Sequence, residues 1–191
     1  MNIIPIFTNF IAVDFLNLDN KAIEDFCYEK LKNDPGVLEN QVQVNYEEGN
    51  GPVMGPLVDA VMARIRQLHL EFDFEPTVEQ AITNVWINLN ANSVTGAPHA
   101  HQVAMFSAVY WPKASAGSGN LEFMTPIAAN RYSIPDGLRT RMNAFNSDMW
   151  SIKPEIGKLV IFPSWLYHFV RGNTDSEDRI SIAINSRFDI G

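Results

Sequence analysis

The spacing of hydrophobic residues changes at about residue 80. Before that point, two segments carry apolar side chains three or four positions apart. They are Ile23, Phe26, Cys27 and Leu31 in the first segment, and Leu57, Val61, Ile65 and Leu68 in the second. Residues at this spacing share one face of a helix, so each segment predicts an amphipathic helix that packs on a core. Asp19 or Asn20 suits the N-cap of the first helix.

Beyond residue 80 the pattern becomes one of short strands between Pro- and Gly-containing turns. The predicted strands cover residues 3–16, 81–90, 99–111, 120–124, 158–162 and 179–188. Several short strands of this kind favour a β-sandwich or jelly roll. We therefore expect an α+β, mostly β fold: a cupin-like double-stranded β-helix with the N-terminal helices packed on one sheet. One domain over 1–191 is expected, with an N-terminal strand and helices in 1–79 and the jelly-roll core in 80–188.

Composition narrows the classes of partner. A formal net charge of −8 argues against nucleic-acid binding, which needs a positive face. Cys27 is the only cysteine, so an intramolecular disulfide is excluded, and we expect a buried core residue there. No apolar run is long enough for a membrane span, and the N-terminus lacks the basic region of a signal peptide. These features predict a soluble, cytoplasmic protein.

Three of the four histidines form a pattern typical of a metal site. His99 and His101 point to the same face if their segment is extended, and a folded double sheet can bring His168 opposite them. Imidazole ligands suit iron, zinc, copper and nickel, so the residue types do not choose the metal. Polar loop residues and a core histidine are the structural alternatives. We expect His69, at the end of the second predicted helix, to be structural.

Arg179 follows His168 by eleven residues and is the candidate anchor for an acidic cosubstrate. Its planar guanidinium pairs with both oxygens of a carboxylate. Ser181 lies on the same strand face and is expected to add a hydrogen bond, while Asn88 and Tyr110 are weaker candidates for cosubstrate binding. The alternative for Arg179 is a surface salt bridge with one of the nearby acidic residues. Those residues are Asp175, Glu177 and Asp178.

Six segments occur in an order that resembles a known family. They are WIN at 86–88, HAH at 99–101, SAVYW at 107–111, NLEF at 120–123, PEIGKLVIFPSW at 154–165 and RISIAIN at 179–185. The order resembles a family of 2-oxoglutarate- and iron(II)-dependent oxygenases of bacteria and bacteriophages, notably marine ones, over roughly residues 84–188. The resemblance implies a double-stranded β-helix, iron(II) held by His99, His101 and His168, and Arg179 on the distal carboxylate of 2-oxoglutarate.

The resemblance also implies an activity. The enzyme would couple decarboxylation of 2-oxoglutarate, with dioxygen, to oxidation of an unknown primary substrate, and we expect a hydroxylase in the cytoplasm of a bacterium or a phage-infected host. A homodimer is one expectation for its assembly. Two alternatives stay open: a cupin-like three-histidine enzyme that does not use 2-oxoglutarate, and a non-catalytic jelly-roll binding or virion-associated protein.

One residue departs from the wider superfamily pattern. The usual motif is His-x-Asp or His-x-Glu, which gives two histidines and one carboxylate, whereas His101 stands at the third position here. A neutral third ligand lowers the negative charge of the site. Glu122 is an alternative carboxylate, ranked below His101 because its strand alternates and is expected to turn Glu122 outward.

Overall fold

Two antiparallel sheets and three helices make up the computed structural model, which describes residues 1, 3, 8–34, 40–91, 93–126, 135 and 137–190. The six-stranded sheet has the order β1-β7-β4-β9-β3-β2. Its strands are β1 (Ala12–Phe15), β2 (Gln41–Gln43), β3 (Glu79–Asn90), β4 (Phe106–Lys113), β7 (Lys158–Pro163) and β9 (Arg179–Asp189). The three-stranded sheet has the order β6-β5-β8. It contains β5 (Leu121–Met124), β6 (Met149–Ile152) and β8 (His168–Val170).

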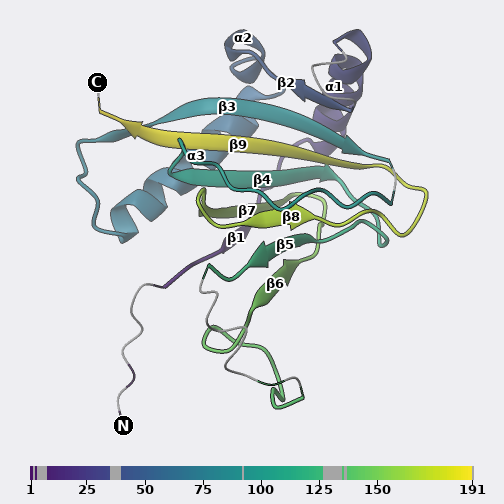
Figure 1. Ribbon diagram of the computed structural model, residues 1–191. Helices are drawn as coiled ribbons and strands as arrows, with labels where there is room; N and C mark the ends of the chain where they lie inside the picture. The colour runs from purple at the N-terminus through teal and green to yellow at the C-terminus, as the bar shows by residue number, and fades with distance from the viewer. Residues whose placement is uncertain are drawn as a thin grey trace.

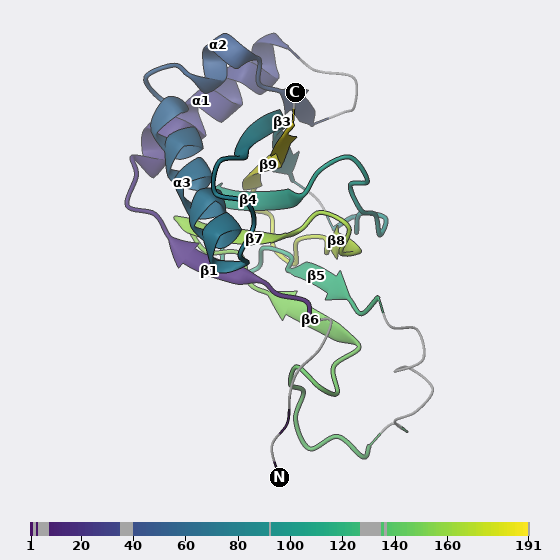
Figure 2. The same cartoon turned by 90° about the vertical axis from the view of Figure 1, so that its left-hand side faces the viewer.

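The helices cover one face of the six-stranded sheet, and the three-stranded sheet lies on its other side (Figures 1 and 2). The helices are α1 (Asn20–Asn33), α2 (Tyr46–Gly49) and α3 (Gly55–Glu71). Asp19 caps α1, because its side chain accepts a hydrogen bond from the Ala22 N–H at 3.0 Å. Both predicted amphipathic helices are therefore confirmed, and α2 is a short addition. No helix within the described parts of the chain is long and apolar enough to cross a membrane.

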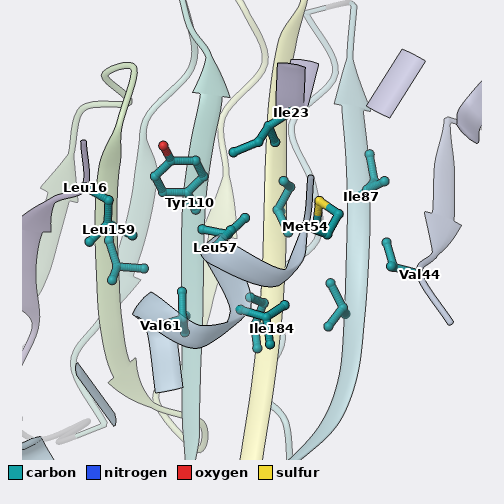
Figure 3. Packing of buried hydrophobic residues seen from close by; sticks show 14 of the residues in the cluster. Leu16, Ile23, Val44, Met54, Leu57, Val61, Ile87, Tyr110, Leu159 and Ile184 are labelled. Atoms are coloured by element: carbon teal, nitrogen blue, oxygen red, sulfur yellow. The ribbon is translucent and has the colours of Figure 1, made fainter. Parts of the chain in front are cut away.

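The main core lies between the helices and the six-stranded sheet. Ile23 and Leu57 extend from α1 and α3 toward Ile87 and Ile184 on the sheet, and all four are at most 2% exposed (Figure 3). This packing follows from the sequence, because the periodic apolar face of each helix meets the apolar face of alternating strands. The mostly β arrangement with helices on one sheet is thus confirmed.

A second core fills the space between the two sheets. Trp111, Val160 and Phe162 point from the six-stranded sheet to meet Leu121 and Phe123 of β5. We call this side of the six-stranded sheet its inner face. Every second residue of a strand points to the inner face. A residue that pairs with an inner-face residue of the neighbouring strand therefore points to the inner face as well.

Some strand boundaries differ from the sequence prediction. The predicted strand 99–111 is wrong in its first half: β4 starts at Phe106, and only His99 of the preceding segment makes a bridge, to His168. The predicted strand 3–16 is shorter, since β1 covers Ala12–Phe15, and residues 2 and 4–7 lie outside the described residues. The short strands β2, β6 and β8 were not predicted.

The N-terminal third also supplies two strands of the main sheet. β1 pairs with β7, with Val13 opposite Val160, and β2 pairs with β3, with Val42 opposite Ile87. The predicted division at residue 79 therefore cuts through one continuous sheet.

Candidate metal and cosubstrate site

His99, His101 and His168 converge at the end of the three-stranded sheet. His168 begins β8, and its backbone exchanges two hydrogen bonds of 2.9 Å with the backbone of His99. The His101 N–H donates to the Ser164 carbonyl at 2.8 Å, which holds the third histidine beside this pair. Their ring centroids are 4.5 to 5.3 Å apart, and one ligand nitrogen from each histidine lies within 4.8 Å of the other two. The backbone thus brings together the three histidines suggested by the sequence.

Hydrogen bonds to carbonyl groups orient two of the rings. Nδ1 of His99 is 3.0 Å from the Ala97 carbonyl, and Nδ1 of His168 is 2.8 Å from the Leu166 carbonyl. A carbonyl only accepts, so each Nδ1 carries the hydrogen and each Nε2 keeps its lone pair. This is the tautomer in which a metal-binding histidine is usually held, with its second nitrogen donating to a carbonyl.

The surroundings favour neutral imidazoles. Burial lowers the pKa of His168 to about 4, with smaller contributions from His99 and His101. Burial, with a smaller effect of His99, also lowers the pKa of His101. The Phe162 ring lies 4.7 Å from the His168 ring and contributes to its apolar surroundings. Because neutral imidazole is the form that binds a metal ion, these surroundings suit a metal centre.

Arg179 begins β9 and is completely buried. Its Nη1 donates to the Gly119 carbonyl at 2.5 Å and to the Arg171 carbonyl at 3.3 Å. Its Nε and Nη2 are buried without a hydrogen-bond partner among the described residues. Burial lowers the pKa of Arg179 to about 10, which leaves the guanidinium positively charged at neutral pH. Within the described part of the chain, Arg179 makes no salt bridge with Asp175, Glu177 or Asp178.

The inner face of β9 connects Arg179 with further polar side chains. Ser181 is two residues further on and points to the same face, opposite Asn88 of β3. The Asn88 side-chain oxygen accepts a hydrogen bond of 2.6 Å from Gln41. Ser181 is 7% exposed, while Asn88 is half-buried. The register thus brings the sequence-predicted Ser181 and Asn88 beside the strand that carries Arg179.

Tyr110 lies on the other face of the sheet. It pairs with Ile182 in the register, its ring belongs to the core beneath the helices (Figure 3), and its hydroxyl donates to Asn20 of α1. The sheet therefore separates Tyr110 from the inner face that carries Arg179, and we do not include Tyr110 in the site.

Glu122 is also turned away from the histidines, as its strand alternation suggested. Phe123, and not Glu122, pairs with His168 in the register. Glu122 is nevertheless only 2% exposed, and it accepts hydrogen bonds from Ser151 and, at 2.6 Å, from Arg171 on the outer face of the three-stranded sheet. The outward-facing Glu122 carboxylate is thus buried, and it is paired with an Arg171 side chain that is itself half exposed.

A buried polar network behind His101 was missed by the sequence reasoning. The Ser107 hydroxyl donates to Asn185 at 2.6 Å and lies 2.9 Å from the Ser164 hydroxyl. The Ser164 carbonyl in turn accepts the His101 N–H, so the network connects the histidine segment with β9. The one available signal was that Asn185 shares its strand face with Arg179.

His69 takes no part in the site. Its ring is fully buried, with Nε2 2.8 Å from the Glu75 carbonyl and aromatic contacts to Phe74 and Phe188. This is the structural role expected from the sequence.

Comparison with known families places residues 84–185 in a match to the family described as "Putative 2OG-Fe(II) oxygenase". These residues include the three histidines, Arg179 and most strands of both sheets. No curated protein matches the chain.

Solved structures with the same overall fold have low sequence identity. A prolyl-4-hydroxylase from Pseudomonas putida is 16% identical, with 94% of this chain and 93% of that chain covered at a TM-score of 0.60. HygX from Streptomyces hygroscopicus, solved with iron bound, is 12% identical (96% and 84% covered, TM-score 0.62). The epimerase SnoN, solved with Fe3+, alpha ketoglutarate and nogalamycin RO, is 15% identical (94% and 79% covered, TM-score 0.62).

Proposed function

This chain belongs to the 2OG-Fe(II) oxygenase family, and we propose that His99, His101 and His168 hold its iron(II) while Arg179 holds the distal carboxylate of 2-oxoglutarate. The family makes the protein an oxygenase that uses iron(II), 2-oxoglutarate and dioxygen. Among the two alternatives, it disfavours a non-catalytic jelly-roll protein. A cupin-like enzyme would keep the histidines but would give Arg179 no ligand.

Two nitrogens of Arg179 that have no hydrogen-bond partner in the described part of the chain support this proposal. Nε and Nη2 lie on one edge of the planar guanidinium, the edge that pairs with both oxygens of a carboxylate. Leaving buried charged donors without a partner costs free energy, and a carboxylate ligand would remove that cost. Nη1 is already occupied by two carbonyls, so it is not needed for the ligand.

The chain's own residues then have distinct tasks. Iron(II) and 2-oxoglutarate, when bound, supply the oxidising chemistry with dioxygen. The Ala97 and Leu166 carbonyls keep the Nε2 atoms of His99 and His168 available for the metal, and Phe162 helps exclude water beside His168. Arg179 fixes the orientation of the cosubstrate, and we assign Ser181 and Asn88 as supporting hydrogen-bond groups on the same sheet face.

The finer features are part of the same proposal. Two facing antiparallel sheets, with the His99 segment bridging to β8, support a double-stranded β-helix in one domain over residues 1–191. We also propose hydroxylation as the reaction type, because it needs no protein group beyond the metal and cosubstrate sites.

An anaerobic titration tests the assignment. Iron(II) is added to the apo protein and then 2-oxoglutarate, and the metal-to-ligand charge-transfer absorption of the chelate gives the cosubstrate Kd. We expect Arg179→Met to raise that Kd by about 100-fold or more, since two charge-assisted hydrogen bonds contribute about 3 kcal/mol together. Iron(II) affinity should stay unchanged in this variant and should be lost in His168→Ala.

Arg66→Met is the matched control. Arg66 lies on α3 and donates to the carbonyls of Pro76 and Val78, so its loss should leave both affinities unchanged. Wild-type affinity for 2-oxoglutarate in Arg179→Met would exclude Arg179 as the anchor and favour the cupin-like alternative. Unchanged iron(II) affinity in His168→Ala would show that His168 is not a metal ligand.

A further inference from the structure

We propose that Asn173 is a positioning residue for 2-oxoglutarate, acting through Gly119 and Arg179. The inference rests on the proposed function, because it concerns how the guanidinium is presented to a carboxylate. Asn173 lies in the loop between β8 and β9, does not touch the three histidines through any described hydrogen bond, and is 3% exposed.

The Asn173 side chain links three segments that surround Arg179. Its Nδ2 donates to the Asn90 carbonyl at 2.8 Å and to the Glu177 carbonyl at 2.9 Å. Its Oδ1 accepts from the Gly119 N–H at 3.2 Å. Asn90 is the residue opposite Arg179 in the β3–β9 register. One amide therefore connects the end of β3, the residues before β9 and the loop that contains Gly119.

Gly119 is the direct link to the guanidinium. Its carbonyl accepts the 2.5 Å hydrogen bond from Arg179 Nη1, while its N–H is the group held by Asn173. A Cβ at this position would lie 1.9 Å from the Arg171 carbonyl oxygen and 2.6 Å from that of Gly172. Only glycine permits so close an approach of two loops. The Arg171 carbonyl, brought near in this way, is the second acceptor of Nη1.

This arrangement fixes the angle of a planar group. Because both carbonyls hold Nη1, the opposite edge with Nε and Nη2 is left to face the ligand. Bidentate pairing needs that edge to be aligned with both carboxylate oxygens, so a rotation of the guanidinium weakens both bonds together. Asn173 holds the Gly119 peptide, and the Gly119 peptide holds the angle of Arg179.

A comparison of two ligands separates positioning from general stability. 2-Oxobutyrate has the same keto and carboxylate groups as 2-oxoglutarate but lacks the distal carboxylate. In wild-type protein loaded anaerobically with iron(II), 2-oxoglutarate should bind much more tightly than 2-oxobutyrate. We expect Asn173→Ala to raise the Kd of 2-oxoglutarate about tenfold, the effect of roughly one weakened hydrogen bond. The Kd values of 2-oxobutyrate and of iron(II) should stay within about twofold, a difference within the scatter of such energies.

Gly119→Ala should reproduce the selective loss by displacing the same loop. Asn173→Ser, which adds no charge and keeps one hydroxyl able to hydrogen-bond, carries the test if Asn173→Ala does not fold. Asn20→Ala is the stability control: it removes the acceptor of the Tyr110 hydroxyl on the opposite sheet face and should leave both ligands' affinities unchanged.

Each outcome separates this inference from the proposed function. If wild-type protein binds the two ligands equally and Arg179→Met changes neither affinity, the anchor itself is wrong. If Arg179→Met weakens only 2-oxoglutarate but the Asn173 variants bind it as wild type does, the anchor stands and Asn173 has no positioning role. An equal loss for both ligands in the Asn173 variants would also overturn the inference, because it would indicate a general structural effect.

Discussion

Replacement of Arg171 by methionine removes a donor from the buried carboxylate of Glu122. The two side chains are joined by a 2.6 Å contact between Nε and Oε1, and Ser151 donates to the other carboxylate oxygen. The Glu122 side chain is 3% exposed, whereas that of Arg171 is 52% exposed. The substitution therefore leaves a charged acceptor in nearly dry surroundings without its cationic partner.

The exposed fractions of the two side chains determine how much free energy of unfolding the substitution removes. A hydrogen bond to a charged group contributes about 1.5–3 kcal/mol, and exposed ion pairs contribute at most about 1 kcal/mol. Since Arg171 is half exposed, water can partly replace it, and we expect a loss near the lower end, about 1.5 kcal/mol. For a protein of this size, that loss corresponds to a fall in Tm of about 3–6 °C.

Urea unfolding followed by fluorescence measures the free energy, and the double variant Glu122→Gln/Arg171→Met is the internal comparison. Removing both charges avoids an unpaired buried carboxylate, so the double variant should be more stable than Arg171→Met alone. Because Glu122 lies on the face opposite His168, iron(II) affinity should be the same in all variants.

Two results would refute this reasoning. Equal stability of Arg171→Met and wild type would mean that the Glu122 carboxylate does not depend on its partner. A loss of iron(II) affinity in a folded Glu122→Gln variant would mean that Glu122 contributes to the metal site after all.

Three further expectations concern single residues. Burial raises the pKa of the Cys27 thiol to about 12, so iodoacetamide should label it only after unfolding, and rapid labelling of native protein would contradict this. Tyr110→Phe should leave the 2-oxoglutarate Kd unchanged in the charge-transfer titration, because the Tyr110 hydroxyl donates to Asn20 on the opposite side of the sheet from the site. A tenfold higher Kd would show that the hydroxyl contributes to cosubstrate binding. His101→Asp, which adds a negative ligand, should bind iron(II) at least as well as wild type by anaerobic titration, and complete loss would show that the position requires imidazole.

The sequence predicted those features that depend on local periodicity. The helical spacing from Ile23 to Leu31 placed α1, and the alternation in 179–185 put Ser181 on the same face as Arg179. Both faces of β4 carry large apolar or aromatic side chains, so alternation did not show which face is beneath the helices, and only the register with β9 places Tyr110 there.

The missed features depend on contacts between distant segments. β8 has only three residues. It pairs with β5 and, through His168, with His99, and both partners lie far earlier in the chain. Asn173 and Gly119 lie in loops, and their hydrogen bonds connect them with groups from distant parts of the chain. The local sequence of a loop does not predict which distant backbone group its side chains will hydrogen-bond.

The packing of the helices on the six-stranded sheet determines whether the family segment, residues 84–185, can fold on its own. Residues 84–185 carry the proposed ligands, but the apolar face formed by Val85, Ile87, Ile182 and Ile184 is covered by α1 and α3, which lie outside that segment. Expressed alone, the segment would expose this face to water and would leave β7 and β3 with unpaired edges where β1 and β2 now bind. Residues 84–185 and the N-terminal third are thus expected to unfold as one cooperative unit. A substitution that changes the volume of a side chain on the helix side of this core then requires a compensating substitution on the sheet side.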